Sequence, residues 1–403
     1  MRSHCPFIRA FLAIGLAAAC RAPFCAAQEG TVAWTHARGD SYATGSSAVP
    51  GPTAPTLRWL YELRSGVTAP LVADATGAVY LGGLDVEGGA VHALDLRDGH
   101  ERWVRRMEGL VTGLATRDGV VLAATSMGVL RALSCATGEI IAETTGLGQV
   151  REGWFSGLLV VPEGPVLVSQ YAALHAVAAD LSTVQWTWPA REHTGEPPIG
   201  LSVPAVTRSG DALVASETLL ALSTADGQVR WEYGMDVPCI PTSPAIDIRD
   251  RVLWGRTDIH AGRGRGFLTC LDGSSGDLLW SQELTGSPTL ALAVSAGRAV
   301  VVTLDRTLSC WSVADGSHLW RVRLPYALAF PGLETTPVID ADGRVYVGDG
   351  PILLCYALAD GEELFRWGVP SGIHGIILPG DGSLVGVGLG AVYCFADAGP
   401  RQQ

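Results

Sequence analysis

The 403-residue sequence contains no lysine and no asparagine, so arginine supplies all 28 of its basic side chains. Without lysine the chain cannot form a Schiff base with a substrate and cannot build a P-loop around a phosphate. Without asparagine it has no acceptor for Asn-linked glycosylation. Charged residues are scarce, at 17%, whereas the chain has 50 glycines and 23 prolines. This composition excludes a disordered or coiled-coil chain and favours a packed, turn-rich β protein.

Positive charge is also in short supply, because the formal net charge is -12 at pH 7. Three of the arginines, Arg2, Arg9 and Arg21, lie in a leader that has no acidic residue, so the rest of the chain is more acidic still. Nucleic acids and anionic membranes attract clustered basic residues, and no such cluster occurs. We expect no nucleic-acid partner. Beyond the leader no apolar run reaches 18 residues, so we expect no transmembrane span.

The N-terminus is typical of an export signal. Two arginines precede an apolar run over residues 10–20, which is too short to cross a membrane and is followed by small residues. Cleavage after Ala27 would fit the small-x-small rule and defines a signal peptide of residues 1–27. The alternative is that residues 17–20 form a degenerate lipoprotein box, in which Cys20 would carry the lipid anchor. Both interpretations predict an exported protein that is periplasmic or attached to the cell envelope.

Six cysteines follow residue 27, and they show neither C-x-x-C nor zinc-ligand spacing. Four of them occupy one recurring position, which alanine fills in the other repeats; the four are Cys270, Cys310, Cys355 and Cys394. Equivalent positions in successive repeats lie a whole repeat apart, beyond the roughly 7 Å Cα separation that a disulfide permits. We predict that these four thiols are free and buried. Cys135 and Cys239 lie elsewhere and are not covered by this argument.

An internal repeat with a period of about 40 to 50 residues dominates the sequence. The clearest unit ends in GAVHALDLRDGHERW at Trp103, and similar segments end at Glu143, Trp186, Trp231, Trp280, Trp320 and Phe365. Each unit has four short runs of alternating apolar and polar residues, separated by turn signals such as Asp98-Gly99. Four strands per repeat are typical of a β-propeller blade.

The two ends of the repeat region complement each other. The last unit stops at Asp397 without a fourth strand, whereas residues 56–63 resemble an isolated fourth strand that contains Trp59. We therefore predict an all-β, eight-bladed β-propeller over residues 56–397, in which the N-terminal strand completes the last blade. This closure would remove an exposed sheet edge. A lead-in of residues 28–55 precedes the propeller, and a tail of residues 398–403 follows it.

The repeat resembles the pyrroloquinoline quinone (PQQ)-like propeller repeat through the pattern G-x-(L/V)-x-A-(L/V)-D-x-x-(T/D/S)-G-x-x-x-W, seen best from Gly89 to Trp103. The lead-in resembles the W-x(5)-D-x-x-x-T-G segment of such proteins, with Trp34 and Asp40 as its first two members and Thr44-Gly45 as its last. The resemblance implies the propeller fold, but fold by itself does not specify function.

The resemblance allows two kinds of protein. Members that bind PQQ and oxidise alcohols or sugars use a divalent metal, a ligand set that commonly includes asparagine, a catalytic aspartate and often a disulfide between adjacent cysteines. This chain has no asparagine and no adjacent cysteines, so we expect neither PQQ nor calcium. The outer-membrane β-barrel assembly propeller lipoproteins are similar in length, blade number and export. Likeness to them implies a non-catalytic scaffold.

The recurring residues are best explained by structure. A tryptophan at one place in each fourth strand fills the gap between blades and bonds its N–H locally, so we do not assign it to cofactor stacking. We interpret Asp95 and Asp272 as residues that cap turns, and we assign no catalytic residue.

Long loops are the best candidates for a functional site, because variable loops on a rigid scaffold commonly bind ligands. In a propeller, connections from one blade to the next share a face with the turns between second and third strands. The long segments expected there are residues 144–157, 187–202, 232–243, 256–266 and 322–336. Their aromatic and arginine residues, types enriched at binding hot spots, are our candidates for partner binding: Trp154, Phe155, Tyr233, Tyr326, Phe330, Arg151, Arg191, Arg263 and Arg265.

We expect a monomer that binds a protein or peptide partner in the cell envelope. The alternative is a propeller that binds a small ligand, such as a quinone, in its central funnel, including a PQQ-dependent dehydrogenase.

Overall fold

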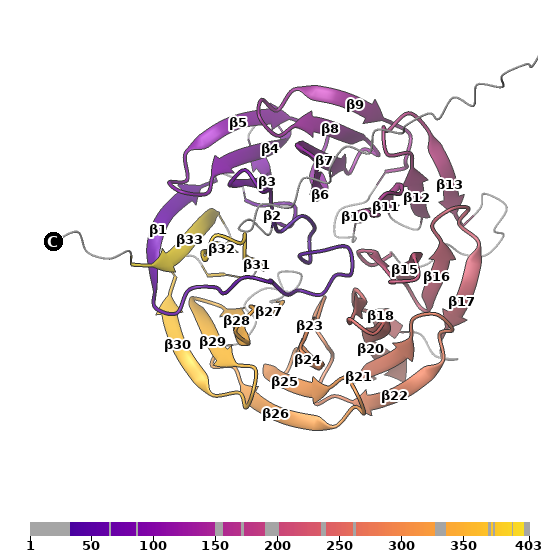
Figure 1. The fold of residues 1–403 in the computed structure, drawn as a ribbon, viewed down its shortest axis with the longest axis vertical. Helices are drawn as coiled ribbons and strands as arrows, with labels where there is room; N and C mark the ends of the chain where they lie inside the picture. Colours follow the sequence, from indigo (N-terminus) through magenta and orange to yellow (C-terminus); the bar gives the residue numbers. More distant parts are fainter. Residues whose placement is uncertain are drawn as a thin grey trace, which may run out of the picture. The chain divides into compact units, whose positions relative to one another are not determined.

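Small antiparallel sheets surround a common axis in the computed structural model of the chain (Figure 1). The structure describes residues 33–63, 66–85, 88–149, 156–170, 173–189, 201–234, 239–260, 263–326, 336–369, 372–373, 375–388 and 390–398. Over these residues there are eight sheets, each with its strands in the order of a propeller blade, so the predicted eight-bladed all-β propeller is confirmed. Within the described part of the chain, no helix has the length and apolar character that crossing a membrane requires.

The blades follow one another along the chain, each with its first strand nearest the axis. The first four are blade 1, β2 (Val72–Ala73), β3 (Ala78–Asp85), β4 (Gly88–Asp95) and β5 (Glu101–Arg106); blade 2, β6 (Val111–Arg117), β7 (Val120–Thr125), β8 (Leu130–Ser134) and β9 (Ile140–Thr144); blade 3, β10 (Ser156–Val160), β11 (Val166–Gln170), β12 (Ala173–Val177) and β13 (Val184–Trp188); and blade 4, β14 (Ala205–Val206), β15 (Asp211–Ala215), β16 (Leu219–Ser223) and β17 (Val229–Tyr233).

The other four blades close the ring. They are blade 5, β18 (Cys239–Pro241), β19 (Ala245–Ile246), β20 (Arg251–His260), β21 (Arg263–Asp272) and β22 (Leu278–Glu283); blade 6, β23 (Ala293–Ser295), β24 (Arg298–Val302), β25 (Thr307–Ser312) and β26 (His318–Arg323); blade 7, β27 (Val338–Ile339), β28 (Arg344–Asp349), β29 (Ile352–Ala357) and β30 (Glu363–Gly368); and blade 8, β31 (Gly375–Ile377), β32 (Leu384–Val387), β33 (Ala391–Asp397) and β1 (Pro55–Glu62).

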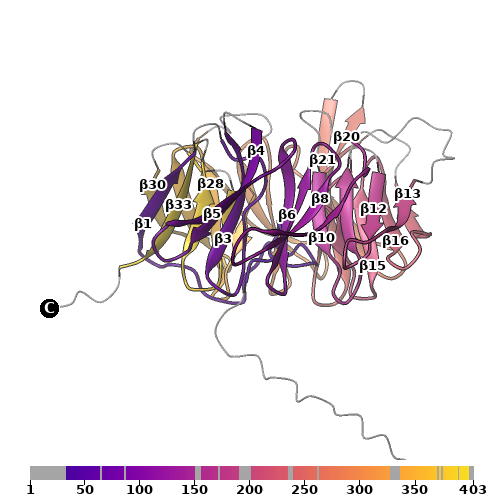
Figure 2. The same cartoon turned by 90° about the horizontal axis from the view of Figure 1, so that it is seen from above.

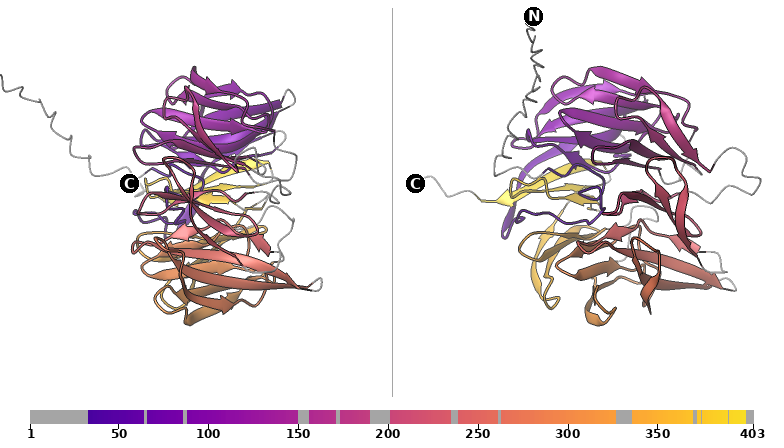
Figure 3. Two further views of the ribbon diagram at one scale, coloured as in Figure 1. Left: turned by 90° about the vertical axis from the view of Figure 1, so that its right-hand side faces the viewer. Right: turned by 45° about the vertical axis from the view of Figure 1, so that its right-hand side comes forward.

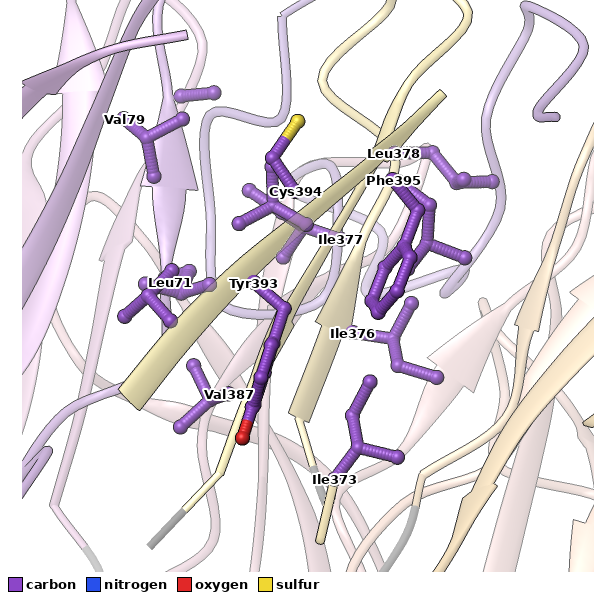
Figure 4. Close-up of a cluster of buried hydrophobic side chains, with 14 of the residues drawn as sticks. Leu71, Val79, Ile373, Ile376, Ile377, Leu378, Val387, Tyr393, Cys394 and Phe395 are labelled. Carbon is purple, nitrogen blue, oxygen red and sulfur yellow. The ribbon is translucent and has the colours of Figure 1, made fainter. Parts of the chain in front are cut away.

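Blade 8 joins the two ends of the chain, as predicted. Its outer strand, β1, pairs antiparallel with β33, and Trp59 lies opposite Cys394. Where the other blades have a tight turn between third and fourth strands, Asp397 accepts hydrogen bonds from the backbone N–H groups of Thr53 and Ala54. Tyr393 and Phe395 point to one side of β33 and Cys394 to the other, so the strand is buried on both faces (Figure 4).

The recurring tryptophans fill the seams between blades. The Trp59 indole donates its N–H to the Leu96 carbonyl of the next blade at 2.8 Å, and its ring lies over Gly99, which has a positive φ of 73°. A Cβ at Gly99 would lie 2.7 Å from that ring, so glycine is required there. The same bond and the same contact with a turn glycine recur for Trp103, Trp186, Trp231, Trp280 and Trp320. These tryptophans therefore lock adjacent blades together.

The seam between blades 2 and 3 corrects the predicted alignment. Ala142, and not Glu143, lies opposite Ala132 and thus at the tryptophan position. Blade 3 has Leu181 at the turn where other blades have glycine, and this leucine is buried against blade 2 although its φ is 62°. In this seam the large side chain, Leu181, comes from the turn of blade 3, and the small one, Ala142, comes from the fourth strand of blade 2. Counting residues from the end of the repeat could not detect this exchange.

The recurring cysteines occupy the predicted small site. Four cysteines are free and fully buried, and each lies opposite the aromatic residue of its blade's fourth strand: Cys270, Cys310, Cys355 and Cys394. Burial raises the pKa of the Cys270 and Cys394 thiols to about 12 and that of Cys310 to about 11. These thiols are protonated at neutral pH and unreactive. Of the two cysteines left open, Cys135 is buried and Cys239 is half-buried, and both are free.

The predicted turn aspartates behave as expected. The Asp95 carboxylate accepts the backbone N–H of Arg97 at 2.9 Å and pairs with Arg102, and Asp272 accepts the N–H of Ser274 at 3.0 Å. Burial works against the ionised form of Asp95, but these bonds still lower its pKa to about 2. Both residues cap the turn between third and fourth strands.

Candidate partner-binding face

The propeller has two different faces. We call the side with the blade-to-blade connections and the turns between second and third strands the loop face, and the opposite side the lead-in face. The lead-in, residues 33–52, crosses the middle of the ring, and its partners lie at the ends of the first strands on the lead-in face (Figure 1). Figure 3 shows the ring of blades from two more sides. The two faces therefore differ in what occupies the axis.

Blade 5 extends beyond its neighbours on the loop face (Figure 2). Strands β20 and β21 are ten residues long and pair over their whole length, and β18 adds to the edge of β20. This corrects the expectation of a loop over residues 256–266, since only residues 261–262 connect the two strands. The arginines and glycines suggested a loop, whereas Gly266 is needed because a Cβ there would meet the Gly286 carbonyl oxygen at 1.9 Å.

A buried ion pair lies at the base of this extension. The Arg256 Nε lies 2.8 Å from Asp258 Oδ1, and both side chains are about 95% or more buried. The guanidinium also donates to Thr269 Oγ1 and lies 4.9 Å from the centre of the Phe267 ring. A buried charge is tolerated only when it is paired and hydrogen-bonded, and these contacts satisfy that condition. The hairpin of β20 and β21 therefore has buried contacts of its own on the loop face.

Arg265 is one of the predicted partner-binding residues, and the structure places it on the outer part of β21. Its side chain is 55% exposed and pairs with Glu283, whose Oε1 lies 2.8 Å from the Arg265 Nε. The hydrogen bond to Glu283 raises the pKa of Arg265, and the same bond lowers the pKa of Glu283. Arg265 is accessible but already paired. Arg263 also lies on β21 and not in a loop.

The two described tyrosines of the predicted set differ. Tyr326 is 46% exposed on the connection between blades 6 and 7, and its backbone N–H is held by the buried Asp349 carboxylate at 2.7 Å. Burial raises the pKa of Asp349. Tyr233, in contrast, is the half-buried last residue of β17, and its ring packs edge-on against Trp254 with 6.2 Å between ring centres. Tyr326 is free to contact a partner, whereas Tyr233 mainly packs.

The remaining predicted residues are not placed. Trp154, Phe155, Phe330, Arg151 and Arg191 lie outside the described residues, as does Cys20. The connection that contains Trp154 leaves β9 and enters β10, and that of Phe330 leaves β26 and enters β27. Both connections thus run from a fourth strand to a first strand and begin on the loop face.

Several exposed apolar residues of the loop face were not predicted. Ile240 (56% exposed) and Ile259 (38%) lie on blade 5, and Leu304 (49%) lies in the turn between β24 and β25 of blade 6. With Tyr326, these three residues form what we call the apolar sector, which covers consecutive blades 5 to 7. Ile240 and Ile259 lie in strands and Leu304 in a polar turn, and single exposed apolar residues of this kind are common on protein surfaces, so the sequence does not single them out.

The described residues show neither grouped metal ligands nor paired cysteines. Within the ranges that the structure describes, no three or more His, Cys, Asp or Glu side chains are grouped so that they could hold a metal ion. The four recurring cysteines lie in four different blades, so they cannot form the disulfide between adjacent cysteines that PQQ enzymes often use.

Comparison with known proteins gives a family match and several structural neighbours. A family model described as outer membrane protein assembly factor BamB matches residues 26–238 and 248–329. No curated protein matches the sequence. BamB from Moraxella catarrhalis is 16% identical over 87% of this chain and 100% of that chain, with a TM-score of 0.66. The quinohemoprotein alcohol dehydrogenase from Comamonas testosteroni is 16% identical over 92% of this chain and 82% of that chain, with a TM-score of 0.65. At such identities the structural likeness shows the fold alone.

Proposed function

The chain belongs to the family of the outer membrane protein assembly factor BamB, since that family model matches well over half of it, and from this premise we propose that it is an exported, non-catalytic scaffold. In this proposal the loop face binds a protein or peptide of the cell envelope, and no quinone or metal is required. The protein would act in the periplasm, either free or held at a membrane through a lipid on Cys20.

The apolar sector is the observation that carries this proposal. Ile240, Leu304 and Tyr326 are each 46% or more exposed, although they come from successive blades and all lie on the loop face. Exposed apolar side chains are available to a protein partner, and a contiguous set of them commonly marks a site of protein association. Two charged side chains of the blade 5 extension and its outer strand, Arg265 and Glu283, are already paired, and Arg306, two residues after Leu304, donates to the Pro325 carbonyl. We therefore expect apolar contact to contribute more to binding than charge.

The lead-in face offers less to a partner, which supports the choice of the loop face. Its axis is crossed by the lead-in, and the turns around it are short and hydrogen-bonded to their own aspartates, as at Asp74 and Asp247. Tight, internally bonded turns offer few free groups to a partner. The loop face offers exposed side chains on long connections and on the blade 5 extension.

Crosslinking from single positions in the native envelope tests the proposal. A photoreactive residue at Ile240, Leu304 or Tyr326 should crosslink to an envelope protein. Ile248 is a matched control, because it is an isoleucine of the same blade that is 83% exposed in the turn between β19 and β20, on the lead-in face. Crosslinks from Ile248 but not from the apolar sector would contradict the proposed face. Alcohol or sugar oxidation by the purified protein with PQQ and Ca²⁺ would instead favour the dehydrogenase alternative.

A further inference from the structure

Seven blades bind the lead-in through the same backbone group. At the end of the first strand, one N–H in each of blades 1 to 7 donates to the lead-in: Ala73 to Trp34 O (2.8 Å), Thr116 to Thr35 O (2.8 Å), Val160 to His36 Nε2 (3.1 Å), Val206 to Ser41 O (2.9 Å), Ile246 to Tyr42 O (2.9 Å), Val294 to Thr44 O (2.7 Å) and Ile339 to Gly45 O (3.0 Å). The lead-in therefore contacts blades 1 to 7 in order along its length, as a bound peptide would.

The lead-in itself is folded so that its acceptors point outward to the blades. Asp40 organises this turn, because its Oδ1 accepts the N–H groups of Tyr42 and Thr44 at 3.1 Å each. Its Oδ2 accepts the Thr44 hydroxyl at 2.9 Å. Tyr42 and Thr44 thus use their N–H groups within the lead-in, and their carbonyls accept the N–H groups of Ile246 and Val294 in the ring. The W-x(5)-D-x-x-x-T-G pattern thus encodes a ligand for the axis.

Side chains add a second set of contacts. Arg38 is 7% exposed, and its guanidinium donates to the Leu292 carbonyl at 2.8 Å and the Pro337 carbonyl at 3.1 Å, which joins the inner ends of blades 6 and 7. Burial lowers the pKa of Arg38 to about 10, with Asp40 acting in the opposite direction, so it stays charged at neutral pH. The Trp34 ring is 1% exposed. Gly51 donates to Asp340 at 2.9 Å at the far end of the segment.

We propose that the inner ends of the first strands form a peptide-binding site whose ligand is the chain's own lead-in, residues 33–52. The segment acts as an axial staple, which holds seven blades at their inner ends while β1 closes the ring at the rim. Thr53 and Ala54 link the two devices; both are exposed, and their backbone N–H groups bond to Asp397 at the rim. Any ligand of the central axis must then enter from the loop face.

A cut between the two devices tests the proposal. A specific protease site placed at Thr53–Ala54 in the full chain that also carries Asp397→Ala, which removes the bonds of Thr53 to the rim, would leave the lead-in attached by its axial contacts only. We expect the lead-in piece and the ring to stay together in gel filtration and in native mass spectrometry after cleavage. Release of the piece from a ring that remains folded would overturn the proposal.

A variant of the cut protein tests the assigned contacts. Arg38→Met keeps the length of the side chain but removes both bonds to blades 6 and 7, and it should speed release of the lead-in at least tenfold. Arg97→Met is the control, because the Arg97 side chain is 86% exposed. Equal release rates for the two variants would contradict the assignment. If Arg38→Met does not fold, His36→Leu is measured in the same way and should also speed release, because it removes the acceptor for the Val160 N–H together with the Thr35 hydroxyl's partner within the lead-in.

Discussion

The chain closes its ring twice, and the two closures differ in kind. At the rim, β1 completes blade 8 by pairing with β33, and Trp59 packs on Gly99 as in the other seams. At the axis, the lead-in joins seven blades through individual backbone N–H groups and one buried arginine. The rim closure uses the strand pairing and tryptophan packing that recur between blades, whereas the axial closure has no counterpart in the repeat. A propeller can thus be closed by a repeated element and also by one that matches no repeat.

The largest effect should follow from removing the rim closure. Deleting residues 55–62 exposes β33 and the unmatched faces of blades 1 and 8, so the protein should aggregate or melt at least about 10 °C lower. Thermal unfolding followed by circular dichroism measures the change. Leu57→Ala, at a position that is 46% exposed, serves as the control. An unchanged melting temperature after the deletion would show that the axial closure is sufficient by itself.

The single seam that holds the rim closure can be weakened more gently. Trp59 is 7% exposed, so Trp59→Ala should lower the free energy of unfolding by roughly 3 to 5 kcal/mol through the cavity it leaves. Gly99→Ala tests the same seam from the other side, because the new Cβ would meet the Trp59 ring. Gly119→Ala is its matched control, since Gly119 also has a positive φ but nothing within 4 Å of its Cβ. Chemical denaturation should show a larger loss for Gly99→Ala.

The axial closure should be the pH-sensitive one. His36 Nε2 accepts the Val160 N–H, which requires a neutral ring, and burial lowers the pKa of His36 to about 4 from 6.5. Protons therefore bind the unfolded chain first, and the stability present above pH 6.5 is lost as the pH falls toward 4. By pH 4.5 the loss from this group should reach about 2 to 3 kcal/mol.

Urea denaturation at pH 7 and pH 4.5 measures this loss in the natural protein and in His36→Gln, whose side-chain oxygen can still accept a hydrogen bond. The variant should lose less stability between the two pH values. The same pH dependence in both proteins would show that another group is responsible. Trp59→Ala, which alters the rim only, should keep the full dependence on pH.

The smallest effect concerns the cysteines that line the seams. Cys270, Cys310, Cys355 and Cys394 are fully buried, and burial raises their pKa values, so a thiol reagent should not label them in the native protein. Labelling should appear only in denaturant, as mass spectrometry of the peptides can show. Rapid labelling of Cys394 alone would mean that the rim closure at β33 opens.

Much of the rim could be predicted from the sequence, because the features that build it repeat. Trp59, the recurring cysteines and the unmatched strand at each end all indicated a closed eight-bladed ring. The seam between blades 2 and 3 was misassigned. Its large residue, Leu181, lies in the turn and its small residue, Ala142, lies in the fourth strand, which is the reverse of the motif. The blade 5 extension was missed because Arg256 and Asp258 look like loop residues until their mutual pairing buries them.

Local pattern by itself determined the number of blades, the turn chemistry and the closing strand of this protein, because strand alternation and turn glycines act over a few residues. Only the tertiary structure decided where the lead-in lies, how the apolar sector of blades 5 to 7 forms, and which arginines are paired. The lead-in contacts, for example, join residues such as Arg38 and Leu292, or Trp34 and Ala73, that are distant in the chain. Their contacts exist only once the ring has brought the ends of seven inner strands around one axis.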